Sequence, residues 1–337
     1  MTSSLINRRV VLSSRPKGVP QAEHFTVDEV PVPDLGDGEL LVQTLFWSVD
    51  PAMRGWANDA PNYLPPVAIG DAMRSFAVGR VVASRNADYA EGELVHGMLG
   101  WQRFAVSDGS NIDRKVADSG LSPSLALGVL GLNGVTAYYG LLDVCDPKPG
   151  ETVVVSTAAG AVGGAVGQIA KIKGARTVGI TSSPEKMALC REKFSYDAVI
   201  SYRDQDVAEA LAEAAPDGVN CYFDNTCGPI SDAVMTKLAL GARICICGTA
   251  SLTDWDPIPV GPRVHRQLLV ARARMQGFLV LDYQDRFGEA IDTLSGWIKD
   301  GKLTYEEHTL EGAEAAPGAI DMLYRGQNAG KLLVRVD

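Results

Sequence analysis

The first 144 residues of this 337-residue chain contain no cysteine, and the six cysteines that follow include no Cys-x-x-Cys pair. The four histidines are isolated from the cysteines in sequence. Nothing in the sequence therefore supports a metal site, because zinc sites draw their ligands from closely spaced cysteine and histidine. In a chain of this length the cysteines are expected as reduced core thiols rather than as a disulfide framework.

Long apolar runs and an excess of positive charge are also missing. The chain has no stretch of about 18 apolar residues, as a membrane-spanning helix requires, and residues 1–10 lack the apolar core of a signal peptide. The net charge of −10 disfavours nucleic acid and an anionic membrane surface as partners. We therefore expect a cytoplasmic protein in which a local site holds any anionic ligand.

The composition is that of a soluble globular protein, with 46% hydrophobic and 21% charged residues. A chain of 337 residues exceeds one ordinary core, so two domains are expected. Proline, glycine and short alternating runs such as residues 40–49 fill the first 125 residues. These features predict an all-β lobe with long connections.

From about Leu125 the pattern changes to alternating strands and helices. The expected strands are 152–155, 177–181, 198–200, 219–223, 242–247 and 277–281, and the expected helices are 162–173, 184–194, 205–214, 230–240 and 287–299. Residues 330–336 form a closing strand that returns to the first lobe. The fold class is therefore α/β, a Rossmann doubly wound parallel sheet with a second, mostly β domain.

A glycine-rich turn, Ala158–Gly167, lies between the apolar strand 152–155 and the next helix. Small residues let backbone N–H groups and the positive end of a helix reach phosphates. In the pattern Gly-x-Gly-x-x-Gly, Ala158 stands at the first position, with Gly160 and Gly163 at the other two. Alanine permits a tight turn but tolerates fewer backbone angles. The pattern predicts a nicotinamide dinucleotide site; close packing of the helix on the sheet is the alternative.

The residues after the second strand indicate which dinucleotide is bound. An NAD site has an acidic residue about 20 positions after the glycines, whereas this chain has Thr181 or Ser182 there. With Ser183 as N-cap and Pro184 as first helical residue, Lys186 lies in the first turn. A cation there costs roughly a few tenths of a kcal/mol, which a phosphate neighbour would remove. We predict NADP(H); a solvated surface lysine is the alternative.

Short motifs recur in a fixed order along nearly the whole chain. They are Ser48–Gly55, Gly97–Trp101, Gly134–Tyr138, Ala158–Gly163, Val166–Lys171, Phe223–Asn225, Cys247–Thr249, Met275–Phe278 and Gly326–Lys331. Together they make the chain resemble the zinc-independent medium-chain dehydrogenase/reductases, specifically the group of prostaglandin, plant alkenal double-bond and bacterial curcumin reductases. The resemblance implies a GroES-like catalytic domain of residues 1–126 plus 290–337 and a Rossmann NADP-binding domain of residues 127–289.

The same resemblance implies a set of cofactor-binding residues. For the pyrophosphate and the adenosine phosphate they are Gly160, Ala161, Val162, Gly163, Ser182, Lys186 and Tyr202. For the rest of the cofactor they are Asn225, Cys247, Gly248, Thr249, Ala250, Ser251, Leu252, Thr253, Phe278, Leu279, Val280 and Asn328. The alternatives are that both asparagines serve turns and that 278–280 is only a buried strand.

The resemblance further implies metal-free reduction of the carbon–carbon double bond of α,β-unsaturated ketones and aldehydes. Hydride goes to the β-carbon, and the resulting enolate needs a hydrogen-bond donor and then a proton at the α-carbon. Many relatives have tyrosine after Asp-Pro, where this chain has Ala52. Tyr63 is the predicted donor and Tyr283 the second candidate; for Tyr63, simple packing is the alternative.

Other functions share most of these features. An NADPH:quinone oxidoreductase has the same fold and cofactor site, and a non-catalytic NADPH-binding protein would retain the same motifs. By resemblance we also expect a homodimer, in which the strand 277–281 could pair across a two-fold axis. The loops that would shape the substrate pocket carry no readable signature of one physiological substrate.

Overall fold

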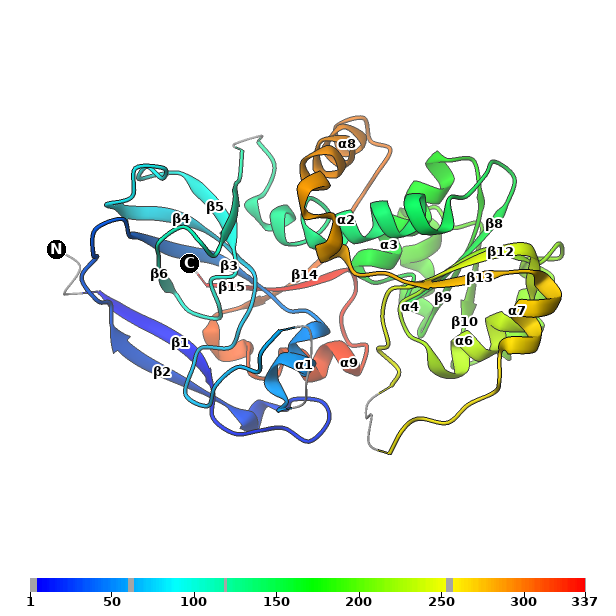
Figure 1. Ribbon diagram of the computed structural model, residues 1–337, viewed down its shortest axis with the longest axis horizontal. Coiled ribbons are helices and arrows are strands. Elements are labelled where there is room, and N and C mark those ends of the chain that lie inside the picture. Colours follow the sequence, from blue (N-terminus) through cyan, green and yellow to red (C-terminus); the bar gives the residue numbers. More distant parts are fainter. Residues whose placement is uncertain (1–4, 60–63, 118–119, 253–256, 337) are drawn as a thin grey trace. The chain divides into compact units, whose positions relative to one another are not determined.

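The structure is a computed structural model that describes residues 5–59, 64–117, 120–252 and 257–336. The chain forms two compact units (Figure 1). Unit 1 consists of residues 1–128 and 307–337, and unit 2 of residues 129–306. Within the described residues, no helix combines the length and the apolar character needed to cross a membrane.

Unit 1 is mostly β. A two-stranded sheet pairs β1 (Ile6–Leu12) with β2 (Phe25–Pro31), and a seven-stranded sheet has the order β14-β15-β3-β4-β5-β7, with β6 paired to β3. The strands of the larger sheet are β3 (Leu40–Ser48), β4 (Ala77–Ser84), β5 (Leu94–Gly97), β6 (Phe104–Ser107), β7 (Ile112–Lys115), β14 (Glu307–Glu311) and β15 (Lys331–Arg335). The short helices are η1 (Ala22–His24), α1 (Ala52–Ala57), η2 (Pro123–Leu127), η6 (Ala313–Ala315) and α9 (Ala319–Tyr324).

The closing strand joins the first lobe, as the sequence predicts. Strand β15 pairs antiparallel with β3 and parallel with β14. The core beside β3 contains the buried side chains of Trp47 and Trp101. Each indole N–H has an acceptor, Thr44 Oγ1 at 2.8 Å for Trp47 and Ser48 O at 3.1 Å for Trp101. The polar atoms of these large rings are therefore satisfied inside the core.

Unit 2 is a parallel six-stranded sheet with the strand order β10-β9-β8-β11-β12-β13. The strands are β8 (Thr152–Ser156), β9 (Arg176–Thr181), β10 (Ala198–Ser201), β11 (Val219–Asp224), β12 (Leu238–Ile246) and β13 (Arg274–Gly277). The helices are α2 (Leu132–Tyr139), η3 (Gly140–Cys145), α3 (Ala161–Ile172), α4 (Pro184–Ala188), η4 (Leu189–Lys193), α5 (Val207–Ala214), α6 (Gly228–Met235), α7 (His265–Ala271), η5 (Val280–Arg286) and α8 (Phe287–Lys299). The predicted doubly wound Rossmann sheet is confirmed, and its order reverses between β8 and β11.

Local sequence explains why β8 and α3 lie so close together. Val153, Val154 and Val155 are fully buried, as expected for a parallel strand covered on both faces. Gly167 of α3 faces Tyr196, and a Cβ on Gly167 would lie 2.2 Å from that ring. The Tyr196 hydroxyl donates to Gly163 O at 2.7 Å. The glycines of α3 therefore let a tyrosine lock the helix onto the layer beside it.

Two expected elements are wrong in part. The strand predicted at 277–281 lies at Arg274–Gly277, and η5 begins at Val280. The apolar residues Phe278 and Val280 pack in a cluster with Tyr139 instead of continuing the sheet. The helix predicted at 230–240 ends at Met235, because Leu238 already pairs with Val219 in the sheet.

Candidate cofactor site

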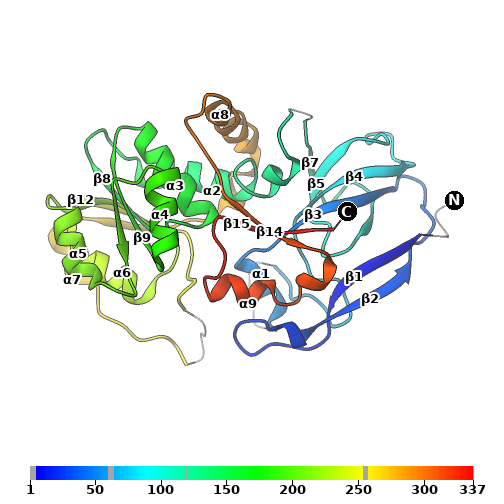
Figure 2. The same ribbon diagram turned by 180° about the vertical axis from the view of Figure 1, so that it is seen from behind.

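The candidate site lies at the carboxyl edge of the unit 2 sheet, where the strand order reverses. β8 and β11 are neighbours there, and the chain leaves them toward α3 and α6. Open α/β sheets bind ligands at this point, because the loops from the two strands diverge. α3 and α4 lie beside β8 and β9 (Figure 2). The predicted cofactor residues of unit 2 follow the ends of β8, β9, β10, β11, β12 and β13.

The glycine turn has the geometry that a pyrophosphate site needs. Gly160 is the N-cap of the 12-residue helix α3, so no side chain covers the first N–H groups of that helix. A Cβ on Gly163 would lie 2.2 Å from Thr157 O, whereas a Cβ on Gly160 would lie 3.1 Å from the nearest atom, Thr157 Cγ2. Gly163 is therefore sterically required. The N-terminal amides of α3, on Ala161, Val162 and Gly163, can receive an anion.

The loop after β9 adopts the predicted cap. Ser183 is the N-cap of α4, its Oγ accepts a hydrogen bond from Lys186 N at 3.4 Å, and Pro184 is in the first turn. Lys186 is half-buried, and its pKa is lowered by burial and by the positive charge of Arg203. Two cations within reach of each other at a strand edge fit a dianionic phosphate.

Arg203 is a residue of this cluster whose role the sequence interpretation missed. It follows Tyr202, which is 41% exposed, and both lie just beyond β10. Ser182, also predicted, is buried at the end of β9. The available signal was the run Ile200–Arg203, in which an arginine follows the predicted tyrosine directly. The roles of Ser182, Lys186 and Tyr202 in binding stay predictions.

The loops after β11 and β12 form one structure, here called the double loop (residues 225–228 and 247–252). Cys247 N and Gly248 N donate to Asp224 O at 2.8 and 3.1 Å. Ala250 N donates to Asn225 O at 3.3 Å and Ser251 N to Thr226 O at 3.0 Å. The structure thus brings the predicted residues 247–252 together with Asn225. Thr253 lies outside the described residues.

Asn225 is fixed against the end of β8. Its Nδ2 donates to Ser156 O at 2.7 Å, and its backbone N donates to Ser156 Oγ at 2.8 Å. A Cβ on Gly248 would lie 2.8 Å from Asn225 O, so glycine is needed there too. The side-chain amide of Asn225 is therefore oriented before any ligand arrives.

Asp224 organises the double loop and was missed as a functional residue. It is fully buried at the end of β11. Its Oδ1 accepts from Tyr222 Oη at 3.0 Å and from the backbone N atoms of Thr226 and Cys227, both at 2.9 Å. Its Oδ2 is buried and accepts no hydrogen bond from the described residues. Its position between Phe223 and Asn225 in a recognisable motif was the only sequence signal.

The predicted residues 278–280 and Tyr283 lie together in an aromatic cluster. Phe278 N donates to Ile246 O at 3.0 Å, and Val280 is buried, whereas Leu279 is exposed. Tyr283 stacks on Tyr139 with ring centroids 4.9 Å apart, and burial raises its pKa. This packing is structural, and a role for Tyr283 as proton donor stays a prediction.

Two predicted residues belong to unit 1 by sequence position. Asn328 is buried there, and its Nδ2 donates to Gly330 O at 3.0 Å. Tyr63, the predicted proton donor, lies outside the described residues. The structure of unit 2 alone therefore assembles the cofactor residues of that unit and leaves both of these predictions open.

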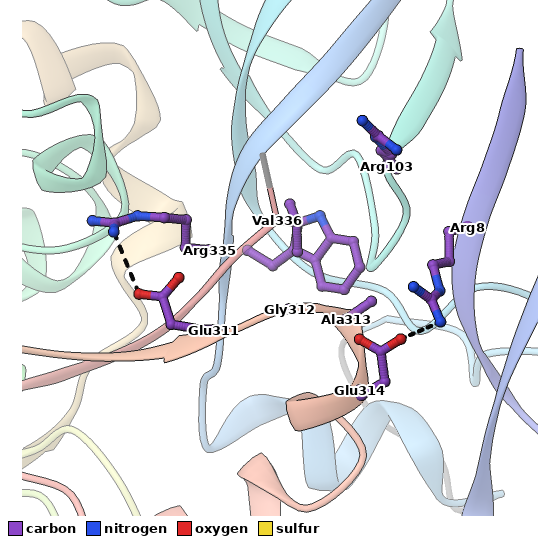
Figure 3. Close-up of a pocket in the computed structure, with 9 residues that line it drawn as sticks. Arg8, Arg103, Glu311, Gly312, Ala313, Glu314, Arg335 and Val336 are labelled. Atoms are coloured by element: carbon purple, nitrogen blue, oxygen red, sulfur yellow. Dashed lines mark hydrogen bonds and ion pairs between the residues drawn. The ribbon is translucent and has the colours of Figure 1, made fainter.

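A pocket of about 150 Å³ in unit 1 contains none of the predicted residues (Figure 3). Arg8 forms an ion pair with Glu314, and Arg335 with Glu311 at 3.3 Å. Such exposed pairs contribute little, and the paired charges leave no strong anion site. Across the described parts of the chain, no group of three or more His, Cys, Asp or Glu residues could hold a metal ion.

Two family models match the chain: an N-terminal domain of oxidoreductase over residues 8–114 and a zinc-binding dehydrogenase over residues 161–296. The chain is 42% identical to the NADPH-dependent curcumin reductase of Escherichia coli over 335 residues, which is 98% of this chain and 97% of the relative. It is 40% identical to prostaglandin reductase 1 of Sus scrofa over 322 residues, 94% and 95% of the two chains. The crystal structure of CurA from Vibrio vulnificus in complex with NADPH is 42% identical, with a TM-score of 0.92 over 98% of this chain and 99% of that chain.

Proposed function

The chain belongs to the medium-chain dehydrogenase/reductases, in the group of prostaglandin, alkenal and curcumin reductases, and from this premise we propose that it reduces the carbon–carbon double bond of α,β-unsaturated ketones and aldehydes. It is an NADP-dependent oxidoreductase, like the relatives that it matches along nearly its whole length. The observation that carries the proposal is the pairing of the glycine turn with Lys186 and Arg203 at one sheet edge.

The residues present fit NADPH. Gly163 leaves a space that a Cβ would fill, and the open amides of α3 suit the pyrophosphate. Lys186 and Arg203 would hold the 2′-phosphate, and neither Thr181 nor Ser182 places a carboxylate there to repel it. Bound NADPH supplies the hydride for the reaction. The double loop, with Asn225 fixed by Ser156, would line the remainder of the cofactor.

The chemistry of the substrate defines what the protein must add. Hydride addition at the β-carbon moves negative charge onto the carbonyl oxygen, and the α-carbon then takes a proton. A hydrogen-bond donor near that oxygen stabilises the charge. Tyr63 remains our proposed donor, with Tyr283 second. The described residues offer no ligand set for the zinc named by the second family model, so we derive no step through a metal.

The proposal is tested by following NADPH oxidation with a panel of enones, enals and quinones, with NADH alongside and the products identified. Enone-dependent oxidation with NADPH preferred, and the saturated carbonyl as product, is the expected result. Turnover confined to quinones would replace the proposal with a quinone oxidoreductase. Tight NADPH binding without turnover of any compound would favour a non-catalytic protein.

We also propose a homodimer through the edge of the unit 2 sheet. β13 lies at that edge, and all four of its residues are exposed. Met275 on β13 is 39% exposed, and Leu269 and Val270 on the preceding helix α7 are 76% and 60% exposed. Exposed apolar side chains beside an unpaired edge favour association. Light scattering should give twice the chain mass, and L269K with M275K should reduce it to one chain; a monomeric wild-type protein would contradict the proposal.

A further inference from the structure

Two cysteines at the carboxyl edge of unit 2 are half-buried, while the other four are buried. Cys227 ends the first segment of strand-to-helix chain after β11, and Cys247 begins the loop after β12. The substrates of the proposed function are electrophiles that react with thiolates. The inference developed here rests on that proposed function, because it concerns how the enzyme tolerates its own substrate class.

The backbone position of Cys227 is one that usually activates a cysteine. Cys227 is the N-cap of the eight-residue helix α6, and helix N-termini stabilise thiolates. Its φ of 57° and ψ of −160° also lie in a region that favours glycine, so the backbone carries strain of roughly 1–3 kcal/mol. From position alone, a reactive thiolate would be expected.

The side chains around Cys227 oppose that expectation. The buried carboxylate of Asp224 accepts a hydrogen bond from Cys227 N at 2.9 Å, which holds its negative charge beside the residue. The Cys227 Sγ donates to Gly248 O at 3.4 Å, a contact that only the protonated thiol can make. Burial, Asp224 and then Asp232 raise the pKa of Cys227 to about 12. The charged groups acting on this thiol are thus both acidic.

The magnitudes decide which effect prevails. A helix N-terminus stabilises a nearby anion by at most about 2 kcal/mol, which lowers a pKa by about 1.5. That is too little to bring a thiol with a pKa of about 12 close to neutrality. Cys247 is in a similar state, since burial and Asp224 raise its pKa to about 12 as well.

We propose that Asp224 keeps Cys227 as a neutral thiol, so that the enzyme can process thiol-reactive enones without being alkylated by them. In the reaction that is avoided, a thiolate sulfur bonds to the β-carbon, the π electrons move onto the carbonyl oxygen, and the α-carbon takes a proton. This addition needs no oxidant or reductant. Because the thiolate is the nucleophile, a protonated Cys227 suppresses the addition.

The test is the alkylation of Cys227 by iodoacetamide over a pH series, resolved by peptide mass spectrometry. In D224N the midpoint of the rate profile should move down by about one pH unit, which makes alkylation about tenfold faster at neutral pH. Y222F is the matched control: it removes the hydroxyl that donates to Asp224 Oδ1 at 3.0 Å but keeps the charge. Y222F should leave the midpoint in place.

Each outcome bears on the proposal. A D224N profile that keeps the wild-type midpoint and only rises in plateau would mean that Asp224 limits access rather than charge, which overturns it. If D224N does not fold, the wild-type profile decides alone, since a midpoint at or below the ordinary thiol value of about 8.5 overturns the proposal.

A second measurement separates this inference from the proposed function. Iodoacetamide labelling needs neither cofactor nor turnover, so it reports on Cys227 even if no enone is reduced. Incubation with methyl vinyl ketone should add one adduct to Cys227 in D224N, and the double variant D224N/C227S should lack that adduct. Equal adduct formation at Cys227 in the wild-type protein would contradict the protective role of Asp224.

Discussion

Each unit holds a buried carboxylate near the end of a strand, but the two are stabilised differently. In unit 1, Asp50 follows β3 and accepts a hydrogen bond from Lys331 Nζ at 2.7 Å and another from Ser48 Oγ. Lys331 Nζ also donates to Ser48 Oγ at 2.6 Å and Val49 O at 3.0 Å, which uses all three N–H donors of the ammonium. In unit 2, Asp224 is held by amide and hydroxyl donors instead.

The difference separates a charge that is neutralised from a charge that is retained. The Lys331–Asp50 pair is closed on itself, so its main effect is on the stability of unit 1. Asp224 keeps its negative charge at the sheet edge and acts on the thiols nearby. Lys186 and Arg203 at the same edge repel each other. Unit 2 thus holds uncompensated electrostatics where a ligand is expected, at a cost in stability.

The largest effect should come from breaking the closed pair in unit 1. K331M leaves the Asp50 carboxylate buried without its cation, and the free energy of unfolding should fall by about 3–5 kcal/mol. Urea denaturation measures this loss. R335A is the matched control on the same strand, because Arg335 and Glu311 form an exposed pair that contributes about 0–1 kcal/mol.

A double variant sharpens this comparison. K331M/D50N removes both charges, so it should be more stable than K331M alone, since no uncompensated charge remains. If K331M weakened NADPH binding and left stability unchanged, the division of roles between the two units would be wrong.

The next largest effect should be on cofactor binding in unit 2. In G163A, the new Cβ meets Thr157 O at 2.2 Å, so the turn must open, and NADPH affinity should fall by about 100-fold, near 2.7 kcal/mol. G160A is the control, because its nearest atoms are at 3.1 and 3.2 Å and its φ of −84° suits alanine. Calorimetric titration of both variants gives the ratio, and equal affinities would remove the steric argument.

A smaller effect should distinguish the two dinucleotides. K186A removes a cation from the Lys186–Arg203 pair, so NADPH affinity should fall about tenfold while NADH affinity stays nearly unchanged. K193A, which removes a lysine paired with Glu306 at 2.5 Å on the adjacent η4, is the control. The same loss for both cofactors in K186A would contradict the 2′-phosphate assignment.

The sequence predicted the fold best where burial is periodic. The helix expected at 287–299 is α8, Phe287–Lys299, because its amphipathic face packs against α2. The edge strand β13 was misplaced because its residues are exposed and carry no apolar pattern, while the neighbouring apolar run packs on Tyr139. Periodicity reports burial, so an exposed strand is hidden from it.

Site residues divide in a similar way. The roles of Gly163 and Ser183 follow from local steric and capping rules, and the sequence predicted their positions. Asp224 and Arg203 depend on partners brought close by the fold: Ser156, whose Oγ donates to Asp224 Oδ1 at 3.3 Å, lies 68 positions away on β8. A short motif shows that such a residue exists but cannot show its neighbours.

The smallest predicted effect is a pH dependence of stability that originates in unit 1. His96 is buried, stacks on Phe76 with centroids 5.5 Å apart, and has its Nδ1 3.1 Å from Asp113 Oδ2. Burial is the largest cause of its pKa being lowered from 6.5, with Arg114 acting in the same direction and Asp113 opposing it. Below pH 6.5 the unfolded chain therefore binds a proton that the folded chain does not. Stability should fall as the pH drops from about 6.5 toward the lowered value, by at most about 1.4 kcal/mol per pH unit.

The variant H96N isolates this contribution. H96N should be less stable at all pH values, because it loses the stacking on Phe76, but its stability should vary less between about pH 7 and pH 5.5. H265N, at an exposed histidine of α7, should keep the wild-type slope. Urea midpoints measured across that range test the difference. A wild-type slope retained in H96N would assign the pH dependence to other groups and leave the buried histidine of unit 1 as a packing residue, electrically silent like the closed Lys331–Asp50 pair.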